Sequence, residues 1–200
     1  MKALILTLML VIPNLVMSAP ISASQMIENF SVDVMKVVRE SNKNNYKKNI
    51  RALITDKYSE NVDFKRMTLV AAGGKSFMKN TSKKQKSALI NEYSRFITGF
   101  MSTVIFENSN HSVDVLPFEG NDTKKTAKVH LETKNPVTGE KNKFSFAVNS
   151  IDGSWKIHDL IVLDTSQVKS NAKEYAPIIK DNGYNGLISD LKELNIKLEN

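Results

Sequence analysis

The spacing of the apolar residues changes twice along the chain, and this pattern constrains the fold more than any other feature. Between Ser24 and Glu107 apolar residues recur every three or four positions, as on helices that bury one face. After His111 they alternate with polar residues, as in strands that bury one face. From Gln167 the helical spacing returns. The sequence therefore predicts an α+β fold with helices on both sides of one β-rich segment.

Four helices are expected in the first half of the chain. Asp63 can cap the third helix, which Gly73 and Gly74 should end or kink, and Ser82 followed by Gln85 has the spacing of a capping box for the fourth. The fourth helix has the widest apolar face and should lie at the centre of the fold. The first two helices carry apolar stripes of Met26, Phe30, Val34, Val37 and Val38, and of Tyr46, Ile50, Leu53, Ile54 and Tyr58.

Four strands are expected, at residues 112–118, 124–134, 143–150 and 154–162. The turn residues between them allow only short connections, which predicts an antiparallel meander of four or more strands with one face packed on helices. Strict alternation would place Trp155, Ile157 and Ile161 on one face of the last strand, and His158, Leu160 and Val162 on the other. Two further helices are expected at residues 167–180 and 186–198.

The first residues have the pattern of a cleavable export signal. Lys2 precedes an apolar run over residues 3–12, which Pro13 ends, and small residues follow up to Ala23. We expect a signal peptide over residues 1–23, cut after Ala23, and a single domain over residues 24–200. The alternative is a retained anchor, which would need about 20 consecutive apolar residues.

Charge and cysteine content limit the possible partners. Between Lys43 and Arg95 the chain has 13 Lys and Arg against 4 Asp and Glu, and it has no cysteine. Disulfides and thiolate metal sites are therefore excluded. An exported protein with this basic segment would meet anionic lipid surfaces instead of nucleic acid. The alternative is that these lysines only solvate the outer faces of helices.

No catalytic or metal-binding pattern is present. The histidines are isolated at His111, His130 and His158, and neighbouring side chains on a strand point opposite ways, so His158 and Asp159 should not act as a pair. Ser166 and Lys169 match a serine–lysine motif of some acyl enzymes, but its companion motifs are missing. The sequence therefore predicts a protein that is not an enzyme and has neither a metal site nor a cofactor.

The C-terminal part of the chain holds a motif of six spaced residues: Trp155, Asp159, Ser166, Gly183, Gly186 and Leu187. With this motif the chain resembles the MlaC family, the periplasmic phospholipid carriers of Gram-negative bacteria that are also called toluene-tolerance proteins. In the helical half, Asp63, Phe64, Met67, Gly73 and Phe77 are similar to the same family, although Ser76 and Phe77 stand where its members usually have Trp. Asp164 and Thr165 also replace a commoner small apolar pair.

The resemblance implies a carrier that maintains outer-membrane lipid asymmetry. Such a protein holds acyl chains in a deep apolar pocket between helices and sheet, with the head group toward solvent, and phospholipid is its cargo. Its partners would be an inner-membrane Mla-type ABC transporter complex and an outer-membrane lipoprotein–porin complex. The protein is expected in the periplasm as a monomer.

The expected pocket lies between the fourth helix and the sheet, although each of its residues could also be ordinary core. The motif residues named above are expected to build the scaffold. The candidate lipid-binding residues are Phe96, Phe100, Met101, Val104, Val129, Leu131, Phe144, Phe146, Val148 and Ile161.

Two other classes of function are compatible with the pattern. Helices followed by a curved meander also suit a periplasmic protein- or peptide-interaction module without lipid cargo. An exported hydrolase is the weakest alternative, because the sequence assembles no activated nucleophile. The lysine-rich segments 43–57 and 75–86 could dock acidic protein surfaces or anionic head groups.

Overall fold

A computed structural model of the 200-residue chain describes residues 21–116 and 125–199. Residues 1–20, which hold most of the predicted signal peptide, and residues 117–124, which hold parts of two predicted strands and a turn, lie outside this range. The first described helix, α1 (Ala23–Glu40), begins after Ser22, whose side chain accepts a hydrogen bond from the Gln25 N–H. Cleavage after Ala23 would separate this cap from its helix.

Four more helices follow α1 in the first half of the chain. They are α2 (Tyr46–Lys57), α3 (Phe64–Ala71), α4 (Lys75–Asn80) and α5 (Lys83–Glu107), with short 3-10 turns at Lys43–Asn45 and Ser59–Asn61. The predicted caps are confirmed: Asp63 accepts from the Arg66 N–H at 2.9 Å, and Ser82 and Gln85 form the capping box. Gly73 and Gly74 end α3 with positive φ angles, and α4 is a short helix that the pattern did not predict.

The second half forms a meander of five antiparallel strands in sequential order. The strands are β1 (Ser112–Val115), β2 (Thr126–Lys134), β3 (Lys141–Ile151), β4 (Ser154–Val162) and the short β5 (Thr165–Ser166). The chain ends in α6 (Gln167–Glu199), in which Gly183 has non-helical angles and separates two helical segments. The predicted meander and the two C-terminal helical segments are therefore confirmed, and β5 is an addition.

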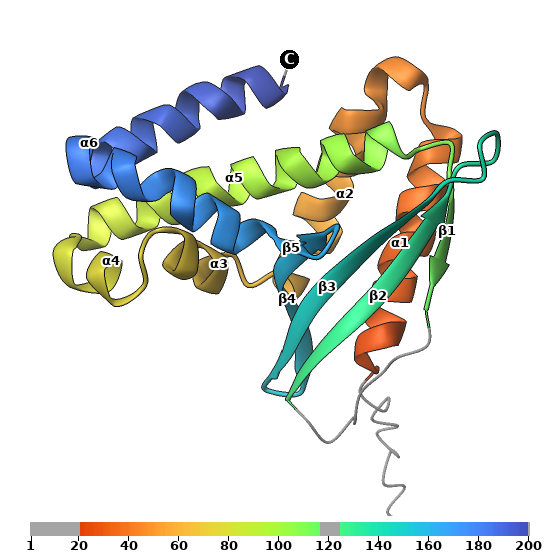
Figure 1. Ribbon diagram of the computed structural model, residues 1–200, viewed down its shortest axis with the longest axis horizontal. Helices are drawn as coiled ribbons and strands as arrows, with labels where there is room; N and C mark the ends of the chain where they lie inside the picture. The colour runs from red at the N-terminus through yellow and green to blue at the C-terminus, as the bar shows by residue number, and fades with distance from the viewer. Residues whose placement is uncertain (1–20, 117–124, 200) are drawn as a thin grey trace, which may run out of the picture.

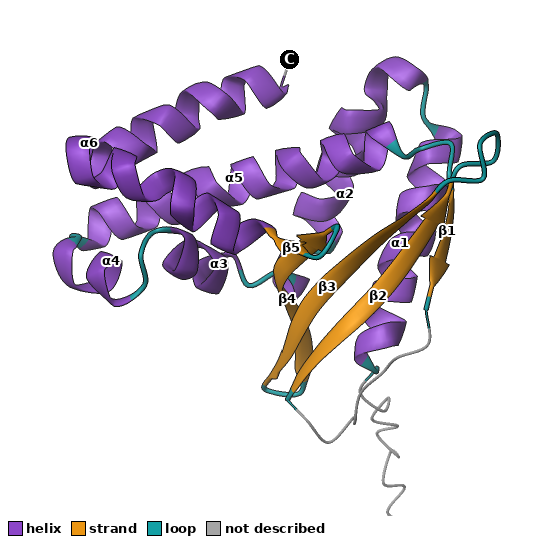
Figure 2. Cartoon of the chain, in the orientation of Figure 1, coloured by secondary structure: helices purple, strands orange, loops and turns teal. Residues whose placement is uncertain are grey.

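The sheet and α1 lie at one end of the molecule, and α3, α4 and α6 lie toward the other (Figure 1 and Figure 2). Helix α1 packs along one face of the sheet, which we call the inner face, while α5 packs against α2, α3 and α6. Leu89, Tyr93 and Ile97 of α5 are almost completely buried, so this helix is central, as predicted. No helix among the described residues combines the length and apolar character that a bilayer span requires.

A β-bulge corrects the predicted faces of β4. Ala147 pairs with Asp159, but the next residue, Val148, pairs with Ile157, which leaves His158 without a partner. One extra residue reverses the alternation, so Trp155 and Ile157 lie on the same face as Leu160 and Val162, not on the opposite one. Ile161, opposite Ser145, lies on the outer face.

Candidate functional site

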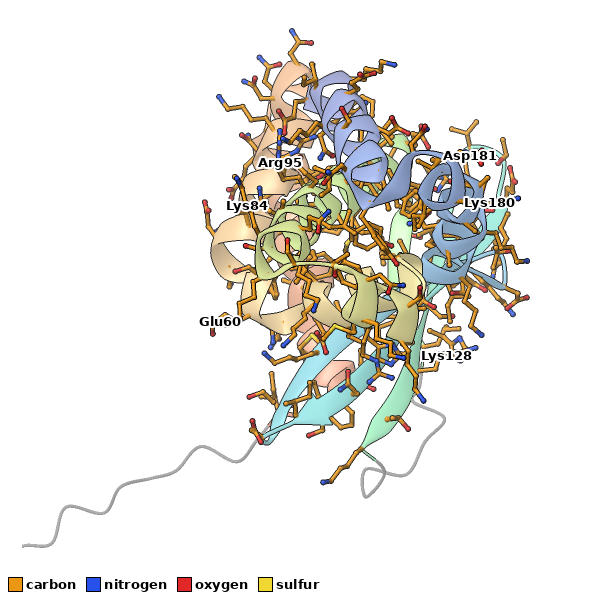
Figure 3. All side chains as sticks on the ribbon, turned by 90° about the vertical axis from the view of Figure 1, so that its left-hand side faces the viewer. Glu60, Lys84, Arg95, Lys128, Lys180 and Asp181 are labelled. Atoms are coloured by element: carbon orange, nitrogen blue, oxygen red, sulfur yellow. The ribbon has the colours of Figure 1, made fainter. Side chains whose placement is uncertain are left out.

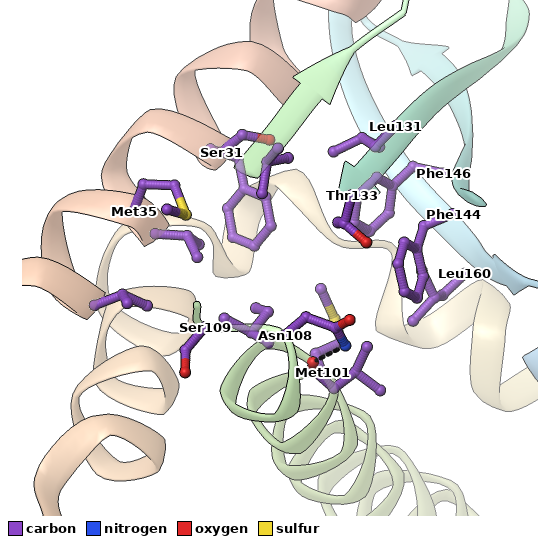
Figure 4. Close-up of a pocket in the computed structure, with 16 residues that line it drawn as sticks. Ser31, Met35, Met101, Asn108, Ser109, Leu131, Thr133, Phe144, Phe146 and Leu160 are labelled. Carbon is purple, nitrogen blue, oxygen red and sulfur yellow. Dashed lines mark hydrogen bonds between the residues drawn. The ribbon is translucent and has the colours of Figure 1, made fainter. Parts of the chain in front are cut away.

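An apolar cavity lies between α1, the last turns of α5 and the inner face of the sheet (Figure 4). Its volume is about 90 Å³, so the cavity is narrow. Its walls are formed by Phe30, Ser31, Val34, Met35, Val38, Met101, Val104, Ile105, Asn108, Ser109, Val113, Leu131, Thr133, Phe144, Phe146 and Leu160.

The α1 wall is built from residues that recur once per helical turn. Phe30, Val34 and Val38 stand four residues apart and are all buried, so they form one stripe on the face that meets the sheet. The Phe30 ring meets the Phe146 ring edge-on, with centroids 6.1 Å apart. This aromatic contact joins α1 to the middle of the inner face.

The sheet wall follows from the strand register. Leu131 of β2 is opposite Phe144, and Phe146 of β3 is opposite Leu160, so these four side chains share the inner face. The bulge between Ala147 and Val148 lies just beyond Phe146. The cavity is thus bounded by the regular part of the β3–β4 pairing.

The α5 wall contains a flexible side chain, Met101, and ends at a polar residue, Asn108. Met101 is buried, Val104 and Ile105 are half-buried, and all three line the cavity. Asn108, which ends the helix, donates from Nδ2 to the Val104 carbonyl oxygen at 2.8 Å. Methionine adapts its shape to irregular partners, so this wall suits a ligand of variable outline.

None of the described residues that line the cavity is charged. Ser31 donates its hydroxyl proton back to the Ile27 carbonyl oxygen at 2.9 Å, which removes this polar group from the cavity surface. The interior therefore offers a good environment for hydrocarbon and a poor one for an ion.

Half of the candidate residues from the sequence line the cavity: Met101, Val104, Leu131, Phe144 and Phe146. The other five do not. Phe96 and Phe100 stack on each other earlier in α5, with ring centroids 6.3 Å apart. Val129 and Val148 are completely buried in the inner face, and Ile161 lies on the outer face because of the bulge.

Sequence reasoning missed the whole α1 wall. The spacing of Phe30, Val34 and Val38 predicts a buried helix face, but from the sequence alone α5, not α1, is expected to form the helical wall of the pocket. The wider apolar face of α5 is used mainly against α2, α3 and α6. The regular four-residue spacing in α1 was the only signal available, and it does not name the partner surface.

The C-terminal motif residues lie outside the cavity lining. Asp159 accepts hydrogen bonds from the Ser166 hydroxyl at 2.5 Å and from the Val168 N–H at 3.2 Å, so it holds the start of α6 on β4. Gly183 forms the kink of α6, and Leu187 and Trp155 are buried. At Gly186 an added Cβ would lie 2.3 Å from the Cβ of Asn182.

The Asp159 carboxylate is held by partners other than the neighbouring His158. Burial lowers the pKa of His158, and the nearby positive charge of Arg66 lowers it further. The Asp159 carboxylate is occupied by Ser166 and Val168. Among the described residues, no group of three His, Asp or Glu side chains is arranged to hold a metal ion.

An uncharged apolar cavity between two helices and a small antiparallel sheet is typical of proteins that bind apolar ligands. Comparison with known families shows which family within this class the chain belongs to. The family described as MlaC protein matches residues 28–193, so the chain belongs to the MlaC family, a family of lipid-binding carriers.

A solved structure supports the same fold. It is a phospholipid-binding protein from Ralstonia solanacearum in complex with a phospholipid, with a TM-score of 0.78 and 20% sequence identity. The match covers 90% of this chain and 100% of the other. A search of curated proteins found no match to the sequence.

Proposed function

We propose that this protein is a periplasmic phospholipid carrier whose acyl-chain site is the cavity between α1, α5 and the sheet. The observation that carries the proposal is the apolar, uncharged lining of this cavity in a MlaC-family chain. The similar fold of the phospholipid-bound Ralstonia protein supports the assignment.

The energetics explain why a carrier is needed. Exposing about thirty methylenes to water at roughly 0.8 kcal/mol each would cost roughly 24 kcal/mol, so a free two-tailed lipid does not cross an aqueous space. The carrier does not have to supply the whole of this free energy by binding. Since the tails start and finish in a bilayer, the cavity only needs to resemble the bilayer interior for transfer to be reversible.

Binding requires the cavity to widen. Ligand clefts commonly enclose about 300–1,000 Å³, whereas the volume of this cavity is about 90 Å³. The α1 wall contacts the sheet through side chains, and backbone hydrogen bonds tie the sheet strands to one another. Outward movement of α1 is therefore the least costly way to admit acyl chains, with Met35 and Met101 adapting to their shape.

The proposed partners are an inner-membrane Mla-type ABC transporter complex and an outer-membrane lipoprotein–porin complex. Lys75, Lys79, Lys83 and Lys84 are exposed along α4 and the start of α5, and Figure 3 shows Lys84 at this helical end of the molecule. Such a basic surface would attract acidic partner surfaces or anionic head groups. Transfer between vesicles and partner complexes should then slow as salt rises from 50 to 500 mM, about the range over which screening becomes strong. Salt-independent transfer would contradict a docking role for these lysines.

Native mass spectrometry of the protein purified from Gram-negative cells tests the cavity assignment. We expect co-purified phospholipid with the wild-type protein, and at least about tenfold lower occupancy in Val104→Glu, because the carboxylate would be desolvated beside acyl chains. Phe100→Glu is the matched control. Phe100 is also half-buried and lies one turn earlier on α5, but it does not line the cavity.

Two outcomes would contradict the proposal. Wild-type protein without any bound lipid would favour a module that binds proteins or peptides. Equal lipid loss in Val104→Glu and Phe100→Glu would show that the lipid site lies elsewhere or depends only on overall stability.

A further inference from the structure

One polar group in the cavity wall has no partner. The side chain of Thr133 is 5% exposed, and its Oγ1 makes no hydrogen bond to any described residue. Thr133 is nevertheless a lining residue of a mostly apolar cavity. A buried hydroxyl without a partner destabilises the folded protein, and a ligand that accepts its hydrogen bond would remove this cost.

Thr133 lies where the polar lining residues gather. Its register partner on β1 is Val113, which follows the α5–β1 turn that contains Asn108 and Ser109. In Figure 4, Thr133 and Asn108 extend into the same space from the sheet and from α5. Asn108, Ser109 and Val113 are half-buried, so this end of the cavity is closer to solvent than the end formed by buried Phe146.

The chemistry of this end limits what the hydroxyl can bind. A hydroxyl donor among apolar and uncharged side chains suits a neutral acceptor attached to hydrocarbon, whereas a buried phosphate would need a cation. The ester carbonyl at the root of an acyl chain has these properties. It also marks the point in a lipid where the apolar chain meets the polar part, as Thr133 does in the cavity.

We infer that the Thr133 hydroxyl donates a hydrogen bond to an acyl ester carbonyl of a bound glycerolipid. The bond sets how deeply the acyl chain enters and makes the site selective for ester-linked over ether-linked lipids. This inference rests on the proposed function, because it assumes that the cavity holds acyl chains.

Competition between two synthetic lipids tests it. Diester phosphatidylglycerol and its diether analogue share the head group and chain length, and only the first has ester carbonyls. We expect the wild-type protein to favour the diester by about two- to tenfold, the usual effect of one hydrogen bond. Thr133→Val, which keeps the branched shape, should bind both lipids equally, and Thr133→Ser should keep the preference.

A second measurement separates this role from a structural one. Without lipid, Thr133→Val should unfold at the same temperature as wild type or higher, because the hydroxyl that it removes makes no hydrogen bond to any residue that the structure describes. Added diester lipid should then raise its melting temperature less than that of wild type.

The outcomes are distinct. Equal binding of both lipids by the wild type, or an unchanged preference in Thr133→Val, would overturn the inference while leaving the carrier function intact. Absence of any lipid binding by the wild type would overturn both.

Discussion

The hydroxyl of Ser166 donates a hydrogen bond to the carboxylate of Asp159 at 2.5 Å. The same hydroxyl accepts from the Lys169 N–H at 3.1 Å, while the second carboxylate oxygen accepts from the Val168 N–H at 3.2 Å. Two free N–H groups at the start of α6 are thereby satisfied, one by its own cap and one by a residue of β4. A negative charge at this position also complements the helix dipole.

We expect Asp159→Asn to lower the free energy of unfolding by about 1–2 kcal/mol, because charge-assisted hydrogen bonds are lost. Ser166→Ala should cost about 1 kcal/mol. The two residues share one network, so the double variant should lose less than the sum. Urea unfolding measures all three. Asp164→Asn, at an exposed neighbouring turn position, is the control and should change little. Additive losses would contradict the shared network.

Two glycines at the kink of α6 should resist substitution for different reasons: the backbone angles at Gly183 and the lack of space at Gly186. Gly183 has φ 65° and ψ −174°, a region open almost only to glycine, although an added Cβ would meet no atom within 4 Å. Gly183→Ala should therefore cost about 1–3 kcal/mol through the backbone alone. Gly186→Ala should also destabilise, but through collision with the Cβ of Asn182.

Thermal unfolding of double variants separates these causes. Asn182→Gly removes the colliding Cβ, so it should recover part of the stability lost in Gly186→Ala. It should recover none of the loss in Gly183→Ala. Equal recovery of stability in both double variants would show that the losses at Gly183 and Gly186 do not have separate causes.

Because of the bulge in β4, substitutions at two adjacent residues should lower stability by different amounts. Leu160 is 5% exposed on the inner face, whereas Ile161 is half-buried on the outer face. Leu160→Thr should lower the free energy of unfolding by about 2 kcal/mol or more, because it leaves a void and buries a hydroxyl. Ile161→Thr should cost about 1 kcal/mol or less. A larger loss at Ile161 would contradict the observed register.

The lowered pKa of His158 should make the stability of the protein depend on pH. Burial and the charge of Arg66 lower its pKa in the folded state, while Asp159 and Asp63 oppose this shift. The unfolded chain therefore binds a proton more readily, and the stabilisation is present above about pH 6.5 and is lost as pH falls below it. We expect His158→Gln to lose less stability than wild type between about pH 7.5 and pH 5.5, measured by urea unfolding. Parallel losses in the two proteins would assign the pH dependence to other groups.

Local features were predictable because neighbouring residues decide them. The caps at Asp63 and Ser82, the end of α3 at Gly73 and the alternation in β3 each depend on a few consecutive residues. Side-chain hydrogen bonds to nearby backbone groups and the conformational freedom of glycine act over one turn of chain. The order of the elements and the antiparallel meander followed from these signals and from short connections.

The α1 wall and the faces of β4 depended on contacts between distant segments. Phe30 meets Phe146 across more than a hundred residues, and nothing in either stripe specifies the other. Likewise, His158 is an extra residue only in relation to β3, since a bulge exists only in a pair of strands.

By itself, the sequence determined the helices and strands other than α4 and β5, the family and the apolar character of the site, because periodicity and residue type are properties of a single segment. Only the tertiary structure decided that α1 forms one wall of the cavity, that Ile161 faces outward and that the Thr133 hydroxyl has no hydrogen-bond partner among the described residues. These depend on which faces meet, and apolar surfaces pack without a directional preference that a sequence pattern could reveal.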